Sequence, residues 1–331
     1  EVVIGDIHYG RRYLKRLQAV TLQDVQAVAS TYLVEEGMSA VTLGPKPDAA
    51  GNPSDSIAEV LALDPFELVE FKSGVRLLLQ EDKRLPKVHI RCVMLGGPFY
   101  EPADQRGVTE LMAELLTKDT AHRSASEIST LIDSIGGSFS ATGGNNTLSL
   151  AIEVLPSDVD VALDLLSDAL TCPTFDEATF RIELDAQIAN LKEEDDEILD
   201  YGFRKLRERF FGVHPFAIAS DGRIADLEQL SRLDVVAHFE RLVTASNVVL
   251  AVSGDFDRAN LQARLQPLLE SGITTKPFKV DQTPNYPGPA ETVNVVEVMD
   301  REQAVVLQAY PDVGIKDERY AVGEMLNELF S

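Results

Sequence analysis

Apolar positions recur along this chain with either the period of a strand or the period of a helix. The order of these patterns predicts groups of strands that alternate with groups of helices. Residues 67–71 and 75–80 flank Lys72-Ser73-Gly74, which is a hairpin signal. Further strands are expected at 39–43, 87–95, 138–142, 147–154, 247–253 and 303–309. Helices are expected at 21–34, 107–118, 124–135, 158–171, 176–197, 198–211, 232–243, 257–270 and from 319 onward.

This order of elements predicts the fold class. Strands grouped with helices that pack on one face define an α+β sandwich with a mainly antiparallel sheet. Ser124 and Glu127 have the spacing of a capping box, which supports a helix that begins beside them. We therefore expect a layered α+β domain as the main body of the chain.

Two stretches resemble each other at one constant offset, which favours a duplicated architecture. Residues 17–45 and 227–255 each predict a capped helix, a polar turn and an apolar strand that ends in glycine. A shorter similarity joins 107–116 to 321–330, although amphipathic helices often look alike. The first pair keeps helix, turn and strand in register, so a duplication explains it better than chance does.

Composition and charge exclude some classes of function. The formal net charge is −24 at pH 7, which argues against nucleic acid as a partner because phosphate binding needs Lys and Arg. No apolar run is long enough to span a bilayer. We expect a soluble protein, and the sequence leaves its compartment open between cytoplasm and periplasm. Cys92 and Cys172 form no metal or disulfide motif and are expected to be buried apolar thiols.

The five histidines do not form a recognisable metal motif, since no two of them have ligand spacing. They are His8, His89, His122, His214 and His238. His89 is expected to be a core or cross-strand residue, and His214 a packing or capping residue beside Pro215. Metal binding by histidine is therefore not expected.

The helix expected at 107–118 carries Glu110, Ala113 and Glu114 at the spacing of a known catalytic motif. Segments with a matching order and spacing follow it: 136–141 (GGSFSA), 155–158 (LPSD), 173–175 (PTF), 193–196 (EEDD) and 214–216 (HPF). Together they resemble the pitrilysin and insulinase family of zinc metallopeptidases. In that family this helix carries H-x-x-E-H, whose histidines bind zinc and whose Glu is the general base.

The resemblance implies that the zinc motif is degenerate here. Glu110 and Glu114 occupy the histidine positions, Ala113 occupies the base position, and Gln187 occupies the position of the third ligand. We expect no catalytic residue, no metal and no cofactor at these positions. The acid pair Glu110 and Glu114 could bind a hard cation such as Ca²⁺, but such a pair is more often a solvated helix face.

The resemblance also implies a domain organisation. We expect duplicated peptidase-like α/β sandwich units: the end of an upstream unit at 1–46, a linker at 47–66, a complete inactive unit at 67–270, a second linker at 271–290, and the start of another unit at 291–331. The chain would then be a fragment centred on the non-catalytic C-terminal half of a longer peptidase.

Two functions remain open. The fragment would be inactive alone and would form a chamber wall that binds peptide or unfolded polypeptide, with zinc in the catalytic half of the parent protein. Alternatively, it would be a non-peptidase scaffold or partner subunit of the same fold, like the core proteins of respiratory complexes. An intact H-x-x-E-H upstream of Glu1 would select the first. A homo-oligomer is possible under either function.

Overall fold

The computed structural model describes residues 66–279, 286, 288–300, 303–314 and 317–330, together with Thr21 and Gln23. The chain divides into two compact units, Glu1–Ala62 and Leu63–Ser331, and every element below belongs to the second. The helix expected at 21–34, apart from those two residues, and the strand expected at 39–43 lie outside the described residues.

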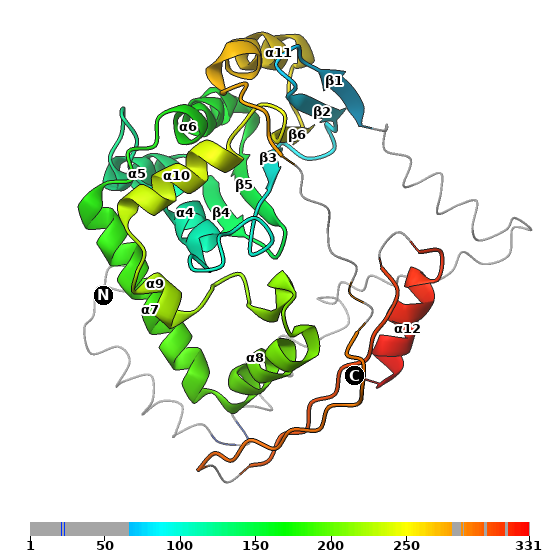
Figure 1. Cartoon of the computed structure of the whole chain (residues 1–331). Coiled ribbons are helices and arrows are strands. Elements are labelled where there is room, and N and C mark those ends of the chain that lie inside the picture. The colour runs from blue at the N-terminus through cyan, green and yellow to red at the C-terminus, as the bar shows by residue number, and fades with distance from the viewer. Residues whose placement is uncertain are drawn as a thin grey trace, which may run out of the picture. The chain divides into compact units, whose positions relative to one another are not determined.

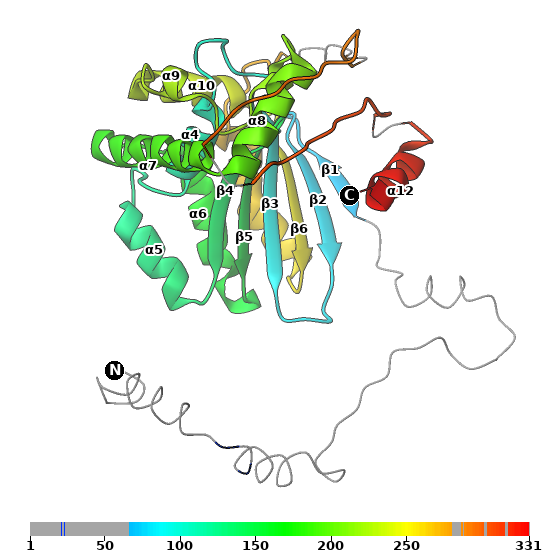
Figure 2. The ribbon, with the colours of Figure 1, turned by 90° about the horizontal axis from the view of Figure 1, so that it is seen from below.

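The second unit is built on one six-stranded sheet (Figure 1). Its strands are β1 (Glu67–Glu70), β2 (Arg76–Glu81), β3 (Val88–Leu95), β4 (Ser138–Gly143), β5 (Thr147–Val154) and β6 (Val249–Gly254). Their order is β1-β2-β6-β3-β5-β4, which Figure 2 shows across the sheet. Strand β6 therefore lies between β2 and β3, although it is the last of the six along the chain.

Neighbouring strands are antiparallel at four of the five junctions. The exception is the parallel pair of β2 and β6, in which Arg76 lies opposite Val249. Strand β6 runs antiparallel to β3 on its other side. The predicted hairpin is confirmed, because β1 and β2 pair directly and Phe71 N–H donates to Val75 O at 2.9 Å.

The sheet has one buried face and one open face, as the alternation along its strands requires. On β3, Val88, Ile90 and Cys92 are at most 2% exposed. The residues between them, His89 and Arg91, are exposed on the opposite face. The same alternation holds on β5. The expected α+β class, with helices on one face of a mainly antiparallel sheet, is confirmed.

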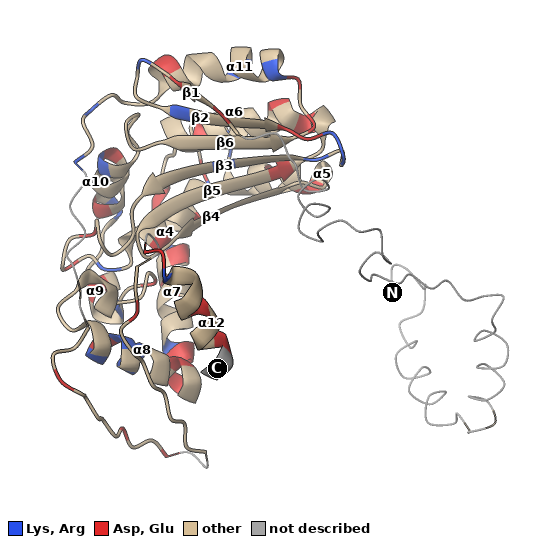
Figure 3. Ribbon diagram, turned by 90° about the vertical axis from the view of Figure 1, so that its right-hand side faces the viewer, with Lys and Arg blue, Asp and Glu red and all other residues tan. Residues whose placement is uncertain are grey.

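Helices follow the strands, and most of them add buried residues to the core (Figure 2). They are α4 (Val108–Leu116), α5 (Ala125–Ser134), α6 (Val159–Thr171), α7 (Glu177–Asp196), α8 (Ile198–Phe211), α9 (Ile224–Leu227), α10 (Arg232–Leu242), α11 (Arg258–Pro267) and α12 (Tyr320–Phe330). Short turns of other helical types occupy Pro156–Asp158, Pro215–Ala217 and Leu268–Gly272. Acidic positions occur along both α7 and α8 (Figure 3).

Side-chain caps begin several of these helices. Ser124 N–H donates to Glu127 Oε2 at 2.8 Å, which confirms the expected capping box. Ser231 N–H donates to Asp234 Oδ2 at 2.8 Å at the start of α10. These caps bind backbone N–H groups that have no partner within the helix.

The strand expected at 303–309 is wrong, since those residues have no regular secondary structure. A strand needs a neighbour to bind its backbone groups, and no strand in the described part of the chain pairs with this segment. The helix expected from 319 is confirmed as α12. No helix among the described residues is both long and apolar enough to cross a membrane.

The division of the sheet into a buried face and an open face leads to a prediction about stability. Leu150 is completely buried on β5, so Leu150→Ala should lower the free energy of unfolding by about 3 kcal/mol. Ser149 precedes it on the open face, and Ser149→Ala should change it by less than about 0.5 kcal/mol. Urea unfolding of both variants measures the difference. Equal losses would contradict the assignment of the two faces.

Candidate functional site

Helix α4 is the element on which the sequence places the degenerate motif, and it begins without a cap of its own. Gly107 stands before it in a left-handed conformation, with φ of 96°, and has no side chain to offer. The carboxylate of Glu101 takes the place of a cap. It accepts hydrogen bonds from Gly107 N–H and Thr109 N–H, each at 3.0 Å.

Glu101 is itself buried, with 7% of its surface exposed. Burial raises the pKa of its carboxyl group, while the hydrogen bonds from Thr109 and Gly107 oppose the shift. A carboxylate at this place also interacts favourably with the positive end of the helix dipole. The start of α4 thus depends on one acidic side chain that lies inside the protein.

A second polar contact joins α4 to α10. The Thr109 hydroxyl lies 2.8 Å from His238 Nε2, and it accepts a hydrogen bond from Gly97 N–H at 3.2 Å. Arg241 Nη2 lies 2.8 Å from His238 Nδ1. An arginine can only donate, so Nδ1 is the acceptor and the proton of the neutral ring lies on Nε2. Burial, aided by Arg241, lowers the pKa of His238 to about 3.

Glu110 is half-buried and binds the end of an edge strand. Its Oε2 accepts a hydrogen bond from Gly143 N–H at 2.6 Å. A Cβ atom at Gly143 would lie 2.8 Å from both Glu110 N and Oε2, so no side chain fits between α4 and the end of β4. The expectation of a solvated acid pair is therefore wrong for Glu110, because β4 covers it, and holds for the exposed Glu114.

The charge of Glu110 is disfavoured by its surroundings. Burial raises the pKa of its carboxyl group, and the negative charges of Glu114, Asp221 and Glu101 raise it further. The hydrogen bond from Gly143 N–H opposes these effects. The net shift is upward, so the Glu110 carboxyl group binds a proton more readily in the folded protein than in the unfolded chain.

Ala113 packs in the core, and the side chain of Gln187 binds backbone carbonyl groups. Ala113 is completely buried in the core. Gln187, on α7, is 9% exposed, and its Nε2 donates to Asp221 O at 2.7 Å and to Gly107 O at 3.2 Å. A Cβ atom at Gly107 would lie 2.6 Å from Asp221 O, so the two loops pack backbone against backbone. The Gln187 amide holds both loops to α7.

The four motif positions do not fit zinc. Zinc needs lone pairs that converge on one point. The amide nitrogen of Gln187 instead donates to two carbonyl oxygens, Ala113 has no ligand atom, and one oxygen of Glu110 is bound to Gly143 N–H. Among the described residues, neither Glu110 nor Glu114 belongs to a cluster that could hold an ion.

The other expected side chains have structural partners. His214 Nδ1 accepts a hydrogen bond from Phe216 N–H at 3.1 Å, which confirms its capping role. His89 lies across from Glu153 on β5, with Nδ1 3.2 Å from Oε2, which confirms a cross-strand position. His8 lies outside the described residues.

The two cysteines differ. Cys92 is a buried core thiol as expected, and burial raises its pKa to about 12. Cys172 is only partly buried, and its Sγ lies 3.7 Å from Asp168 Oδ1. The expectation of an apolar buried thiol is wrong for Cys172, because this residue ends α6 beside a polar loop.

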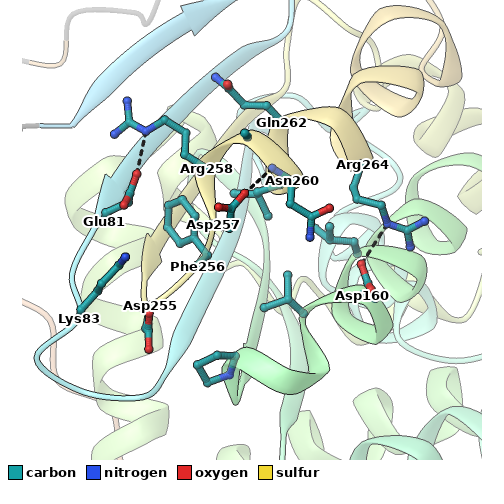
Figure 4. A pocket seen from close by; sticks show the side chains of 15 residues that line it. Glu81, Lys83, Asp160, Asp255, Phe256, Asp257, Arg258, Asn260, Gln262 and Arg264 are labelled. Atoms are coloured by element: carbon teal, nitrogen blue, oxygen red, sulfur yellow. Dashed lines mark hydrogen bonds and ion pairs between the residues drawn. The ribbon is translucent and has the colours of Figure 1, made fainter.

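A pocket of about 620 Å³ lies between β2, α6 and α11 (Figure 4). The two arginines that line the pocket form ion pairs with carboxylates. Arg258 Nε lies 3.0 Å from Glu81 Oε1, and Arg264 Nε lies 3.0 Å from Asp160 Oδ1. These ion pairs engage both guanidinium groups and offset their positive charge.

The six-stranded α+β fold and the helix α4 can now be compared with known proteins. Two family models match the sequence: "Insulinase (Peptidase family M16)" over residues 76–218, and "Peptidase M16 inactive domain" over residues 229–331. The chain therefore belongs to the insulinase family of peptidases, and the resemblance inferred from its segments is confirmed.

Zinc proteases and subunits of the cytochrome b-c1 complex are among the proteins whose sequences are similar to this chain. An uncharacterized zinc protease of Rickettsia felis is 22% identical over 206 residues, which cover 62% of this chain and 50% of that protein. Mitochondrial cytochrome b-c1 complex subunit 1 of Bos taurus is 23% identical over 195 residues, covering 59% and 40%. The chain thus spans half or less of the length of these relatives.

Solved structures show the same fold. The peptidase M16 inactive domain from Pseudomonas fluorescens superposes with a TM-score of 0.60 at 20% identity. The match covers 65% of this chain and 52% of that one. At this identity the likeness concerns the fold.

The raised pKa of Glu110 predicts a pH dependence. Its folded state binds the proton more tightly than the unfolded state, so this contribution to stability is full below the ordinary pKa of 4.5 and is lost as the pH rises through the folded pKa. Glu110→Gln removes the titration and should raise the urea midpoint at pH 7 but not in acid. Glu114→Gln, on the exposed side of α4, is the control and should have a smaller effect. An unchanged midpoint for Glu110→Gln at pH 7 would contradict this assignment.

The amide of Gln187 generates a second prediction. Gln187→Ala removes the side-chain donor of Asp221 O and one of the two donors of Gly107 O, which also accepts from Leu111 N–H at 3.1 Å, and should destabilise the protein by about 1–3 kcal/mol. Gln187→Glu, which restores the family's ligand type, should be destabilising too, since a carboxylate would face two carbonyl oxygens. Thermal unfolding with and without Zn²⁺ tests both variants. Stabilisation of Gln187→Glu by zinc would show that the position still belongs to a metal site.

Proposed function

We propose that this chain forms the non-catalytic half of an insulinase-type zinc metalloendopeptidase, where it lines the substrate chamber. The observation that carries the proposal is the reassignment of the motif positions, since Glu110 and Gln187 bind backbone groups where a peptidase of this family would bind zinc. Zinc and the catalytic base would belong to another part of the parent protein.

The proposal includes a division of the chain into units. The complete inactive unit covers 67–270, between linkers at 47–66 and 271–290. Residues 1–46 would end an upstream unit, and 291–331 would begin the next. The repeat between 17–45 and 227–255 supports this division, because each stretch would then close one unit.

Strand β4 offers a way to hold a peptide. It ends the sheet in the part of the chain that the structure describes. Gly144 N–H donates to Thr147 O at 2.8 Å, so residue 144 faces β5. Antiparallel strands alternate the direction of their backbone groups, and those of Phe139 and Ala141 therefore face the outer edge. An extended peptide could add there as a further strand.

Glu110 limits where such a peptide binds. Residue 143 also faces the edge by this alternation, but its N–H is bound to the Glu110 carboxylate. The added strand would thus pair with Phe139 and Ala141 and end before Gly143. Main-chain pairing selects for extended backbone more than for sequence, which suits peptides or unfolded polypeptides as partners.

A scaffold role without peptidase activity is the second candidate. The similarity to cytochrome b-c1 complex subunit 1 of Bos taurus favours it, because that protein is named as a subunit of a larger complex. The gene sequence upstream of Glu1 distinguishes the two: an intact H-x-x-E-H motif supports the peptidase half, and a degenerate one supports the scaffold.

Peptide binding at β4 is tested by removing one edge N–H group. Ala141→Pro should weaken binding of a fluorescein-labelled extended peptide by about tenfold, since a hydrogen bond to the added strand is lost. Ser140→Ala is the matched control, because it changes an open-face side chain and leaves every backbone group in place. Fluorescence anisotropy measures both affinities.

A change in the probe avoids any effect on folding. Two probe peptides are compared, each N-methylated at one of the two alternating sets of backbone amides. The peptide whose methyl groups lie on the amides that pair with β4 should not bind, and the other should bind as the unmethylated peptide does. Equal affinities for both methylated probes would mean that the peptide does not bind as a strand.

The proposal of a non-catalytic half also predicts that this chain alone has no peptidase activity. The purified chain with added Zn²⁺ should not cleave a quenched fluorescent peptide. Turnover that a chelator abolishes, and that Glu110→Gln with Glu114→Gln also abolishes, would overturn the proposal. A metal bound elsewhere on the chain without turnover would leave it intact.

A further inference from the structure

Three possible metal ligands meet at the C-terminal end of α6, away from the motif positions. They are His122, Asp168 and Cys172, and one ligand atom from each lies within 4.8 Å of the others. Among the described residues, this is the cluster of His, Cys, Asp and Glu that could hold an ion. His122 comes from the loop between α4 and α5, while Asp168 and Cys172 come from α6 and its C-cap.

The backbone holds the two segments together. Thr120 and Pro173 form an isolated antiparallel bridge, and Ala121 N–H donates to Cys172 O at 2.9 Å. The Thr120 hydroxyl accepts a hydrogen bond from His122 N–H at 3.2 Å. The positions of His122 and Cys172 are therefore set by bonds within the fold and need no metal to bring them together.

The carboxylate of Asp168 has one oxygen committed and one directed at the cluster. Asp168 is 8% exposed, and its Oδ2 forms an ion pair with Arg123. Its Oδ1 lies 3.9 Å from His122 Nε2 and 3.7 Å from Cys172 Sγ. Ligand atoms around a tetrahedral zinc lie roughly 3–4 Å apart, given bonds of about 2.0–2.3 Å. Small side-chain rotations would complete such a geometry.

The chemistry of the three ligands selects the ion. Ca²⁺ and Mg²⁺ take oxygen ligands, so a thiolate and an imidazole disfavour them. A mixed set of sulfur, nitrogen and oxygen suits Zn²⁺, whose sites use all three. The site also lies at the C-terminal end of α6, where the helix dipole favours a cation.

We propose that His122, Asp168 and Cys172 form a surface site for Zn²⁺, with a fourth position open to water. The side chain of His122 is 66% exposed, so the ion can enter from solvent without opening the core. The site would fasten the loop after α4 to the end of α6. It uses none of the motif positions and does not depend on the proposed function.

Cobalt spectroscopy with zinc competition tests the site. The metal-free, reduced chain titrated with Co²⁺ should show a thiolate-to-cobalt charge-transfer band that stoichiometric Zn²⁺ removes. Cys172→Ser should abolish the band, and His122→Gln should weaken Zn²⁺ binding by at least about tenfold, because even the loss of an outer partner of a ligand has that effect.

The controls separate this site from others. Cys92→Ala removes the other thiol, His89→Gln removes another exposed imidazole, and Glu110→Gln changes the degenerate motif. All three should retain the cobalt band and the zinc affinity. The metal-free Cys172→Ser and His122→Gln variants should unfold at the temperature of the unaltered chain, which shows that they fold. The proposal would be overturned if the unaltered chain showed no thiolate band. It would also be overturned if Cys172→Ser and His122→Gln both bound zinc with the affinity of the unaltered chain.

Discussion

The buried carboxylate of Glu101 is the interaction on which the organisation around α4 depends. Helix α4 starts at a glycine that cannot cap it, and Glu101 accepts the N–H groups of Gly107 and Thr109 from within the core. The same turn is joined to α10 through Thr109 and His238. Removing this carboxyl group would be costly, because the N–H groups of Gly107 and Thr109 would lose their partner inside the protein.

Two of the motif positions have backbone groups as their partners. With α4 held in place, Glu110 lies against the end of β4 and Gln187 reaches the carbonyls of Gly107 and Asp221. Each side chain supports backbone packing where the family's zinc peptidases would place ligands. The chain has the fold of the family, and the proposed role as a wall or a scaffold depends on that fold and on no catalytic group of α4.

Much of the fold could be predicted from the sequence, because alternation and capping are local signals. The hairpin at Lys72-Ser73-Gly74, the capping box of Ser124 and Glu127, and the strands β3 to β5 all follow from residues close together in the chain. The segment 303–309 has a strand-like pattern, but a strand also needs a neighbour. The insertion of β6 between β2 and β3 is likewise a property of the whole sheet.

The site was harder to predict, since its contacts join distant residues. Nothing near Glu101 in the sequence indicates that it caps α4, and Glu110 appears as half of an exposed acid pair until Gly143 is placed beside it. Cys172 could have been recognised as a possible ligand, because Asp168 precedes it by one helical turn and so shares its face. The spacing of the histidines alone does not reveal this pair.

Anomalous scattering at the zinc edge, from crystals of this chain grown with Zn²⁺, tests the central claim most directly. The claim is that Glu110 and Gln187 have structural roles, and that Glu110, Glu114 and Gln187 bind no metal. We predict no anomalous peak within bonding distance of these three residues, whatever is bound elsewhere on the chain. A peak coordinated by Glu110 and Glu114 would contradict the account and restore a metal site to helix α4.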